Sequence, residues 1–265
     1  MSRVPVAVAL ELEPELLAQI AAVDERVELV DASTPLADAE VALVGTPPGQ
    51  LPEVLREAVR SEGSRLRWVQ STWAGAGEQY AAAELTRDEL DRVALTTSAG
   101  VYATPLAEFA LLGLLALAKD LPRLLRSQAE RRWDRFVMAE LRDWTVLVLG
   151  VGGIGREVAR LASAFGAHTI GVKRTPGKVP HVDEVHSTDR LRELLPRADG
   201  LVVTLPLTAA TRGLLDREAL SLLPPHAVLV NVGRGGVVDE DALVEALRNG
   251  RLAGAALDVF AVEPL

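Results

Sequence analysis

A short apolar run that passes straight into a glycine-rich turn is the feature that most restricts how this chain can fold. The run from Thr145 to Gly155 reads TVLVLGVGGIG, which predicts a buried strand, a Gly-x-Gly-x-x-Gly turn and the start of a helix. In such a turn Gly150 allows the tight bend, Gly152 lets a ligand approach the backbone, and Gly155 lets the helix pack closely on the strand. Free N–H groups and the dipole at the helix N-terminus favour a pyrophosphate there. The turn therefore predicts a domain that binds a dinucleotide.

The rest of the chain alternates short Val- and Leu-rich runs with longer segments of helical period, as in parallel sheets covered by helices. Strands are expected at Val6–Leu10, Val27–Val30, Val41–Val44, Trp68–Gln70 and Ala94–Thr96, and then at Val146–Leu149, Thr169–Val172, Leu201–Thr204, Val228–Asn231 and Gly254–Leu257. Helices are expected at Pro14–Val23, Leu51–Glu62, Ile154–Phe165, Leu191–Leu195, Asp216–Leu222 and Glu240–Asn249. The predicted fold class is α/β, with two doubly wound parallel-sheet domains at 1–100 and 101–265. The first is flavodoxin-like, and the second is a Rossmann dinucleotide-binding domain.

The segment between the two series predicts a buried connecting helix. Thr104 offers an N-cap followed by Pro105 at the first helical position, and the apolar pattern runs to about Asp120. The next segment, Arg123–Arg142, mixes Arg and Glu with aromatic residues and has no strand pattern. It is either an exposed helix and loop or, as residues 121–143, an arm that packs on another subunit, since Trp, Met and Arg are enriched at interfaces.

Composition narrows the function classes. The formal net charge is −9 and no basic stripe stands out, so we expect no nucleic acid partner and no anionic membrane partner. The longest uncharged apolar run, Phe109–Ala118, is about half a membrane span, and the N-terminus resembles a core strand rather than a signal peptide. Without cysteine there is no disulfide, thiolate metal site or cysteine nucleophile, and we expect no metal. These features predict a cytoplasmic protein.

The residues after the second strand of the glycine-turn domain bear on the choice of cofactor. About 20 residues past the turn, an acid normally accepts a hydrogen bond from the adenosine ribose 2′-hydroxyl. This chain has Lys173, Arg174 and Thr175 there, and no acid between His168 and Val182. Two cations and a hydroxyl suit a 2′-phosphate, so we predict a preference for NADP(H) over NAD(H), with Arg174 as the main contact. The alternative is that these residues are solvated surface cations.

Further motifs follow one another in register along the chain. They are Val69–Gly75, Gly100–Phe109, Gly150–Gly155, Leu205–Thr208, Asn231–Gly235 and Asp258–Pro264. Together they resemble the D-isomer-specific 2-hydroxyacid dehydrogenases, close to the glyoxylate/hydroxypyruvate reductase type. The resemblance implies hydride transfer between a nicotinamide cofactor and a small 2-keto or 2-hydroxy acid, a substrate-binding first domain, and a homodimer.

The resemblance also implies roles for individual residues. Arg234 would bind and polarise the substrate, because a guanidinium fork matches carboxylate and carbonyl oxygens. Glu263 would pair with a catalytic histidine and raise its pKa. The substrate pocket would be formed by Trp73 and by the backbone N–H groups of Ala74 and Gly75. The cofactor would contact Thr104, Gly150, Gly152, Gly153, Ile154, Gly155, Lys173, Arg174, Thr175, Thr204, Leu205, Pro206, Thr211, Val232, Gly233 and Asp258.

Simpler structural roles remain open for four of these residues. Arg234 could cap a helix or lie on the surface, and Trp73 could belong to the core. Asp258 could cap a turn, and Glu263 could be an ordinary loop carboxylate. Each alternative would leave the site without one of its parts.

The sequence departs from the family pattern after Glu263. In the family, the catalytic histidine and a segment that completes the substrate domain follow this position, whereas the sequence stops at Leu265. The four histidines match no family motif: His168, His181, His186 and His226. Either a tail lies outside this sequence, or the truncation is real. In the second case we expect a cofactor-binding dimer without turnover, acting as a redox sensor or a scaffold.

Overall fold

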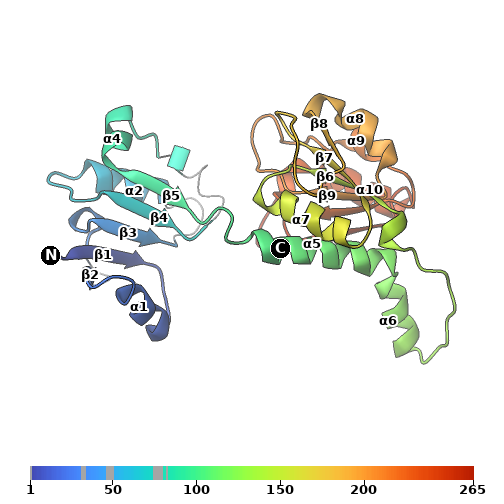
Figure 1. Ribbon diagram of the computed structural model, residues 1–265, viewed down its shortest axis with the longest axis horizontal. Helices are drawn as coiled ribbons and strands as arrows, with labels where there is room; N and C mark the ends of the chain where they lie inside the picture. Colours follow the sequence, from blue (N-terminus) through green and yellow to red (C-terminus); the bar gives the residue numbers. More distant parts are fainter. Residues whose placement is uncertain (1, 31–33, 46–50, 74–79, 82) are drawn as a thin grey trace. The chain divides into compact units, whose positions relative to one another are not determined.

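Two compact units make up the chain, each built around its own parallel sheet (Figure 1). The computed structural model describes residues 2–265 except 31–33, 46–50, 74–79 and 82. The units are Met1–Val101 and Tyr102–Leu265. The predicted α/β class with two doubly wound parallel sheets is confirmed.

The first unit contains a five-stranded sheet in the order β2-β1-β3-β4-β5, with every strand parallel to its neighbours. Its elements are β1 (Val4–Ala9), α1 (Pro14–Ala21), β2 (Val27–Val30), β3 (Val41–Val44), α2 (Leu51–Arg60), β4 (Trp68–Ser71), α4 (Arg87–Arg92) and β5 (Ala94–Thr97). Alternate strand residues point to opposite faces. On one face Ala42, Val44 and Val69 join Leu55 and Val59 of α2 in a buried cluster. The other face, beside α1, carries an apolar groove lined by Val6, Val41, Leu43 and Trp68 among others.

Helix α4 was not among the predicted elements, although its start has a recognisable sequence signature. The Thr86 hydroxyl accepts a hydrogen bond from the Glu89 backbone N–H at 3.3 Å, and the Glu89 carboxylate accepts one from the Thr86 N–H at 2.6 Å. This reciprocal capping box satisfies two N–H groups that a helix start leaves free. The Arg60 guanidinium, 2.7 Å from Glu89 Oε1, and the Thr86 N–H together lower the pKa of Glu89 to about 2.

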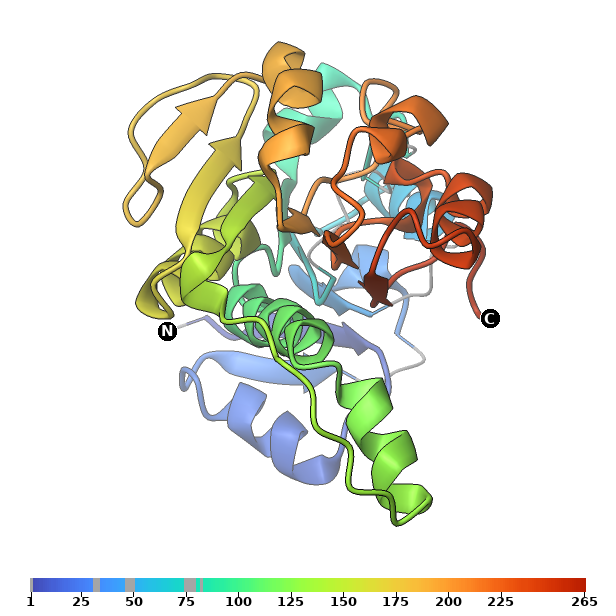
Figure 2. The same ribbon diagram turned by 90° about the vertical axis from the view of Figure 1, so that its right-hand side faces the viewer.

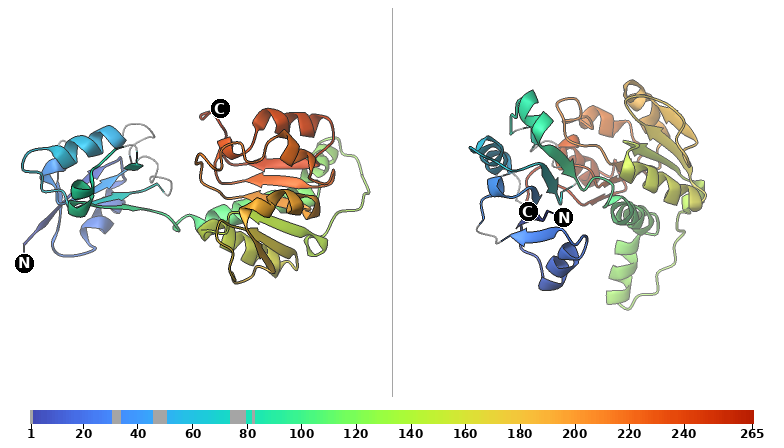
Figure 3. Two further views of the ribbon diagram at one scale, coloured as in Figure 1. Left: turned by 90° about the horizontal axis from the view of Figure 1, so that it is seen from above. Right: turned by 60° about the vertical axis from the view of Figure 1, so that its left-hand side comes forward.

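The second unit contains a six-stranded parallel sheet in the order β11-β10-β9-β6-β7-β8 (Figure 3). The strands are β6 (Thr145–Leu149), β7 (His168–Val172), β8 (Glu184–His186), β9 (Gly200–Val203), β10 (Val228–Asn231) and β11 (Gly254–Leu257). The helices are α5 (Ala103–Ala118), α6 (Leu121–Ala129), α7 (Gly153–Ala164), α8 (Leu191–Leu194), α9 (Arg217–Ser221) and α10 (Glu240–Arg248). Helices α5 and α7 cover one face of the sheet, and α8, α9 and α10 cover the other (Figure 1). Single 3-10 turns occur at Leu36–Asp38, Leu141–Asp143, Thr188–Arg190, Leu195–Arg197 and Gly235–Val237.

Two details of the second unit correct the sequence-based expectations. Strand β8 was not predicted, because its three half-buried residues, Glu-Val-His, form an edge strand without an apolar run. The prediction that Thr104 caps the connecting helix is wrong. Helix α5 begins at Ala103, and Tyr102 occupies the N-cap position without a side-chain cap. Thr104 is therefore an exposed residue of the first turn.

After α5 the chain leaves the body of the second unit as α6 and returns in an extended segment (Figure 2). Arg123 links the two parts, since its Nε and Nη2 donate to Asp134 at 2.7 and 3.0 Å and its guanidinium stacks 4.1 Å from the Phe136 ring centre. The returning segment exposes Trp133 and Val137, which are 85% and 97% accessible. The segment is thus folded on itself while large apolar side chains face outward.

Candidate cofactor and substrate site

The glycine turn lies where β6 passes into α7. Gly150 has φ +102°, and a Cβ on Gly155 would lie only 1.9 Å from the Gly150 carbonyl oxygen, so a side chain at position 155 would collide with the turn. A Cβ on Gly152 would meet nothing within 4 Å. The backbone N–H groups of Gly153, Ile154 and Gly155, at the start of α7, make no hydrogen bond within the described part of the chain. The turn therefore presents an open backbone surface and the positive end of a helix dipole, which fit a pyrophosphate.

The residues after β9 hold the turn in place. The Thr204 hydroxyl donates to the Gly150 carbonyl oxygen at 2.5 Å. Thr211 acts within its own loop, since its hydroxyl donates to the Pro206 carbonyl oxygen at 2.6 Å and accepts from the Thr208 N–H at 2.8 Å. Thr204 and Thr211 therefore both donate their hydroxyl protons to protein carbonyl groups.

Cationic side chains follow β7 at the same edge of the sheet. The backbone N–H of Lys173 donates to the His186 carbonyl oxygen at 3.0 Å, which ties the residue to the end of β8. Arg174 and Thr175 are exposed. Among the described residues, neither Lys173 nor Arg174 has a side-chain hydrogen bond or ion pair. Their charges are thus available to an anionic ligand.

The loop after β10 carries Arg234 at an exposed position. A buried amide, Asn231, fixes this loop: its Oδ1 accepts from the Gly233 N–H at 3.0 Å, and its Nδ2 donates to the Arg234 carbonyl oxygen at 3.1 Å. The Arg234 guanidinium donates once, through Nη1 to the Gly233 carbonyl oxygen at 2.8 Å. Asn231 was not singled out from the sequence, and its signal was a polar residue at the end of an apolar strand. The arrangement leaves most of the guanidinium donors of Arg234 free for a ligand.

The loop after β11 packs directly against the Arg234 loop. A Cβ on Gly235 would lie 1.9 Å from the Phe260 carbonyl carbon and 2.3 Å from the Ala261 nitrogen, so the missing side chain permits this contact. Glu263 Oε1 accepts from the Phe260 N–H at 2.8 Å. Asp258 is exposed, and its side chain makes no hydrogen bond within the described ranges. The structure thus brings the Arg234 and Glu263 loops into contact at the carboxyl ends of neighbouring strands.

The other candidate residues precede the second sheet in the sequence and do not belong to its loops. Trp73 is 48% exposed and so is not a core residue, and its N–H donates to Ser71 Oγ at 3.1 Å. Ala74 and Gly75 lie outside the described residues. Thr104 is exposed on the first turn of α5. Of the three residues expected at the substrate pocket, Trp73 is thus the one within the described residues.

The histidines lie apart from Arg234. His168 and His186 both bind the Glu184 carboxylate, through Nε2 contacts of 2.8 and 2.9 Å. His226 Nε2 lies 2.7 Å from Asp199 Oδ1, before the start of β10. His181 lies in the loop between β7 and β8. None of the four lies on the loops that carry Arg234 and Glu263.

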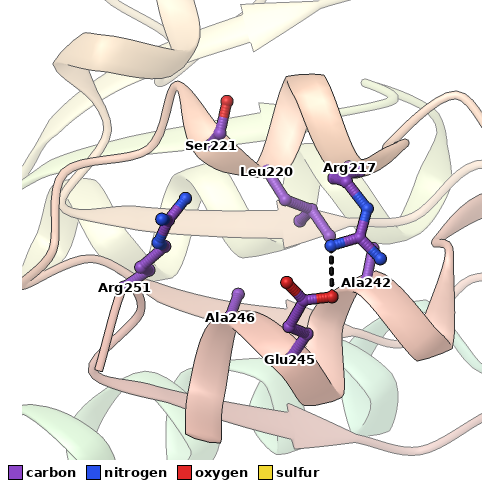
Figure 4. Close-up of a pocket in the computed structure, with 7 residues that line it drawn as sticks. All are labelled: Arg217, Leu220, Ser221, Ala242, Glu245, Ala246 and Arg251. Carbon is purple, nitrogen blue, oxygen red and sulfur yellow. Dashed lines mark hydrogen bonds and ion pairs between the residues drawn. The ribbon is translucent and has the colours of Figure 1, made fainter. Parts of the chain in front are cut away.

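A separate pocket of about 190 Å³ lies between α9 and α10 (Figure 4). Arg217 and Glu245 form an ion pair on one side of it, and Arg251 reaches it from the loop before β11. It shares no residue with the glycine turn or with the two loops at the carboxyl ends of β10 and β11. We therefore give it no part in the candidate site.

Outside the four gaps, no helix is both long and apolar enough to cross a bilayer. Within the same ranges, no group of three or more His, Cys, Asp or Glu side chains is arranged to hold a metal ion.

Comparison with known proteins identifies the second unit by sequence. Residues 111–265 match the family model for the NAD-binding domain of D-isomer specific 2-hydroxyacid dehydrogenases. D-3-phosphoglycerate dehydrogenase of Methanocaldococcus jannaschii is 41% identical over 154 residues, which are 57% of this chain and 29% of that protein. The Mycobacterium tuberculosis protein of the same name is 42% identical over 163 residues, or 60% of this chain and 30% of its own. The matched part therefore spans less than a third of these relatives.

Solved structures match both units. NADPH-dependent glyoxylate/hydroxypyruvate reductase from Sinorhizobium meliloti, in complex with NADP and sulfate, has a TM-score of 0.83 and 28% identity over 99% of this chain and 83% of its own. A D-isomer specific 2-hydroxyacid dehydrogenase from Xanthobacter autotrophicus, in complex with NADPH and MES, has a TM-score of 0.80 and 31% identity over 100% of this chain and 83% of its own. The family model covers more than half of the chain, and the fold agrees with it. The chain belongs to the D-isomer specific 2-hydroxyacid dehydrogenase family.

Proposed function

We propose that the protein is an oxidoreductase that transfers a hydride between NADP(H) and a small 2-keto or 2-hydroxy acid. The observation that carries the proposal is the contact of Gly235 with the Phe260–Ala261 backbone, which joins the Arg234 and Glu263 loops. These loops lie at the same edge of the sheet as the glycine turn. Ligands of doubly wound sheets bind at this edge.

Each part of the site has a task in that reaction. The bound nicotinamide cofactor supplies or accepts the hydride. The N–H groups of Gly153, Ile154 and Gly155 would bind its pyrophosphate. The Arg234 guanidinium binds the substrate carboxylate and stabilises the negative charge that develops on the carbonyl oxygen. Val232 and Gly233, which are both buried, and Asp258, which is exposed, would hold the cofactor at this edge of the sheet.

Reduction also requires a proton for the new hydroxyl group. Glu263 Oε1 is held by the Phe260 N–H, and Oε2 has no partner among the described residues. A carboxylate fixed in this way can orient an imidazolium and favour its charged form. We propose that Glu263 does so for a histidine supplied by polypeptide that follows Leu265.

We propose NADP(H) as the preferred cofactor and NAD(H) as a weaker one. Within the described ranges Lys173 and Arg174 form no ion pair, and both of the solved structures described above contain NADP or NADPH. Cofactor preference is measured as kcat/KM for NADPH against NADH with one keto acid. Equal values, or a preference for NADH, would contradict this part of the proposal.

We propose a glyoxylate- or hydroxypyruvate-type substrate, handled by residues 1–100 as the substrate-binding domain with Trp73, Ala74 and Gly75 at the pocket. The structural relative from Sinorhizobium meliloti supports small keto acids, whereas the curated relatives are named for a phosphorylated substrate. The test follows the loss of NADPH absorbance with glyoxylate, hydroxypyruvate and 3-phosphohydroxypyruvate. A clear preference for 3-phosphohydroxypyruvate would contradict the proposed substrate and favour the phosphorylated one.

Arg234 offers the sharpest test of the reaction itself. Arg234→Ala removes the substrate cation and should lower kcat/KM about 100-fold or more while leaving cofactor binding intact. Arg248→Ala is the matched control, because Arg248 is an exposed arginine in the last turn of α10. Equal activities of the two variants would contradict the proposed role.

An alternative proposal is a cofactor-binding dimer without turnover, acting as a redox sensor or scaffold. It rests on the positions of the four histidines, none of which lies on the Arg234 or Glu263 loop, where a histidine would be needed to supply the proton. NADPH binding by the full-length protein without reduction of any keto acid would favour it. Reduction at rates that depend on Arg234 would exclude it.

We also propose a homodimer formed through residues 121–143, within a Rossmann domain of residues 101–265. Support comes from the exposed Trp133 and Val137 on that segment. We expect no nucleic acid or membrane partner, and a cytoplasmic location, which cell fractionation would test.

A further inference from the structure

We propose that Glu240 is a positioning residue, which anchors the Glu263 loop to the start of α10 and so fixes Glu263 relative to Arg234. The inference rests on the proposed function for its catalytic part. Glu240 Oε1 accepts a hydrogen bond from the Ala261 backbone N–H at 2.6 Å. The two residues are 21 positions apart in sequence, so the contact joins separate segments.

Two neighbouring N–H groups of the Glu263 loop each donate to a carboxylate. The Phe260 N–H donates to Glu263 itself, and the Ala261 N–H donates to Glu240. On the side of the Arg234 loop, the same Phe260–Ala261 backbone lies where a Gly235 side chain would be. The loop is thus held from two directions, by α10 and by Gly235.

The ordinary role of an acid at a helix start does not account for this contact. Asp239 is the N-cap of α10, with its Oδ1 accepting from the Ala242 N–H at 2.9 Å. Glu240 and Asp241 both lie in the first turn, where negative charge is favourable to the helix dipole. Asp241 is exposed and makes no side-chain hydrogen bond within the described residues; its charge acts on the helix dipole and on Arg217. Of these two first-turn acids, Glu240 is the one that also binds the Glu263 loop within the described residues.

The consequence for the reaction concerns proton transfer rather than cofactor binding. With the anchor in place, Glu263 Oε1 is occupied and Oε2 is held in one direction. Without it, the loop keeps its contact with Gly235 and the hydrogen bond from the Asp258 N–H to the Asn231 carbonyl oxygen at its start. The part of the loop that carries Glu263 then samples several orientations. A misplaced carboxylate orients its partner acid poorly, so turnover falls while the glycine turn is unaffected.

The first measurement is independent of activity. Amide hydrogen exchange at Ala261 is compared in the full-length protein and in Glu240→Ala, Glu240→Gln and Asp241→Ala. Loss of a charge-assisted hydrogen bond should speed exchange of Ala261 about tenfold in Glu240→Ala. Glu240→Gln keeps an acceptor oxygen at the same reach and should recover most of the protection, while Asp241→Ala should match the wild type. Equal exchange in Glu240→Ala and the wild type would overturn the anchor.

The second measurement separates positioning from folding. Glu240→Ala should lower kcat about tenfold, leave the dissociation constant of NADPH unchanged and shift the pH profile of kcat, with recovery in Glu240→Gln. Faster exchange at Ala261 with unchanged kcat and pH profile would show an anchor without catalytic effect and overturn the positioning role. Absence of turnover in the wild type would overturn the proposed function and with it the catalytic part of this inference, whereas the exchange data would still decide the anchor.

Discussion

Thr204 donates its hydroxyl proton to the carbonyl oxygen of Gly150 across 54 residues of sequence, and so ties the end of β9 to the glycine turn. Thr204→Val keeps the shape of the side chain and removes the donor. We expect the free energy of unfolding to fall by about 1 kcal/mol and NADPH to bind more weakly, because the turn loses its support. Urea denaturation and cofactor titration measure both effects. Thr175→Val, at an exposed threonine, is the control for stability alone, and equal losses of unfolding free energy in the two variants would contradict the role of Thr204.

The glycines of the turn should separate stability from cofactor binding. Gly155→Ala places a Cβ against the Gly150 carbonyl oxygen and should destabilise the protein by about 1–3 kcal/mol or more. Gly152→Ala meets open space in the protein and should leave the unfolding free energy nearly unchanged while weakening NADPH binding. Chemical denaturation and fluorescence titration distinguish the two. If Gly152→Ala bound NADPH with the affinity of the wild type, the pyrophosphate would not lie close to the backbone at Gly152.

Arg174 should determine the preference for the phosphorylated cofactor. Arg174→Ala removes the main cation proposed for the 2′-phosphate, so the dissociation constant of NADPH should rise about tenfold while that of NADH stays the same. Lys178→Ala changes another exposed cation of the same loop and serves as the control. A parallel loss of NADH binding would point to a structural effect instead.

The capping box of α4 predicts a dependence of stability on pH. The pKa of Glu89 is lowered from 4.5 to about 2 by Arg60 and by the Thr86 N–H, so ionised Glu89 stabilises the folded state. This contribution is complete above pH 4.5 and is lost as the pH falls toward 2, because the unfolded state then binds the proton first. Unfolding free energies measured across this range should converge for the wild type and Glu89→Gln at the acidic end. Glu62→Gln, at an exposed acid, should follow the wild type throughout.

If residues 121–143 form the dimer interface, changes in this segment should alter the oligomeric state. Trp133→Ser combined with Val137→Ser removes the two most exposed large apolar groups of the returning segment and should convert dimer to monomer. Sedimentation velocity at several concentrations measures the change. Val23→Ser removes an apolar side chain that is 79% exposed in the first unit and should leave the dimer intact. A monomeric wild type would contradict the proposed homodimer.

Sequence patterns predicted both sheets because their strands form short apolar runs. In β9 and β10 of the second unit every residue of the run is buried. Strand β8 was not predicted, because its three half-buried residues form no apolar run. Helix α4 was missed even though Thr86 and Glu89 have the spacing of a capping box, because its six residues have no long apolar pattern. The start of α5 was misplaced because Thr104 and Pro105 are typical of a helix start, whereas the helix begins with Ala103.

The sequence indicated the candidate site where a single short motif contains both the turn and the ligand-binding groups. The glycine turn is one such motif, and Lys173–Thr175 after the adjacent strand β7 is another. It was less predictable where support comes from distant sequence. Asn231 and Glu240 fix the Arg234 and Glu263 loops through contacts that only the folded chain creates. For Glu240, no local signal distinguishes it from Asp241, which occupies the same helical turn.

The close contact at Gly235 also limits how the protein can be engineered. Two loops whose backbones touch with no side chain between them cannot be exchanged one at a time, because a donor loop of different path would collide with its neighbour or leave a gap. A graft of this site into another Rossmann scaffold must therefore carry both loops and the beginning of α10 as one block. Libraries that aim at a new substrate should accordingly keep Gly235, Phe260 and Ala261 fixed in backbone and vary only outward-facing side chains.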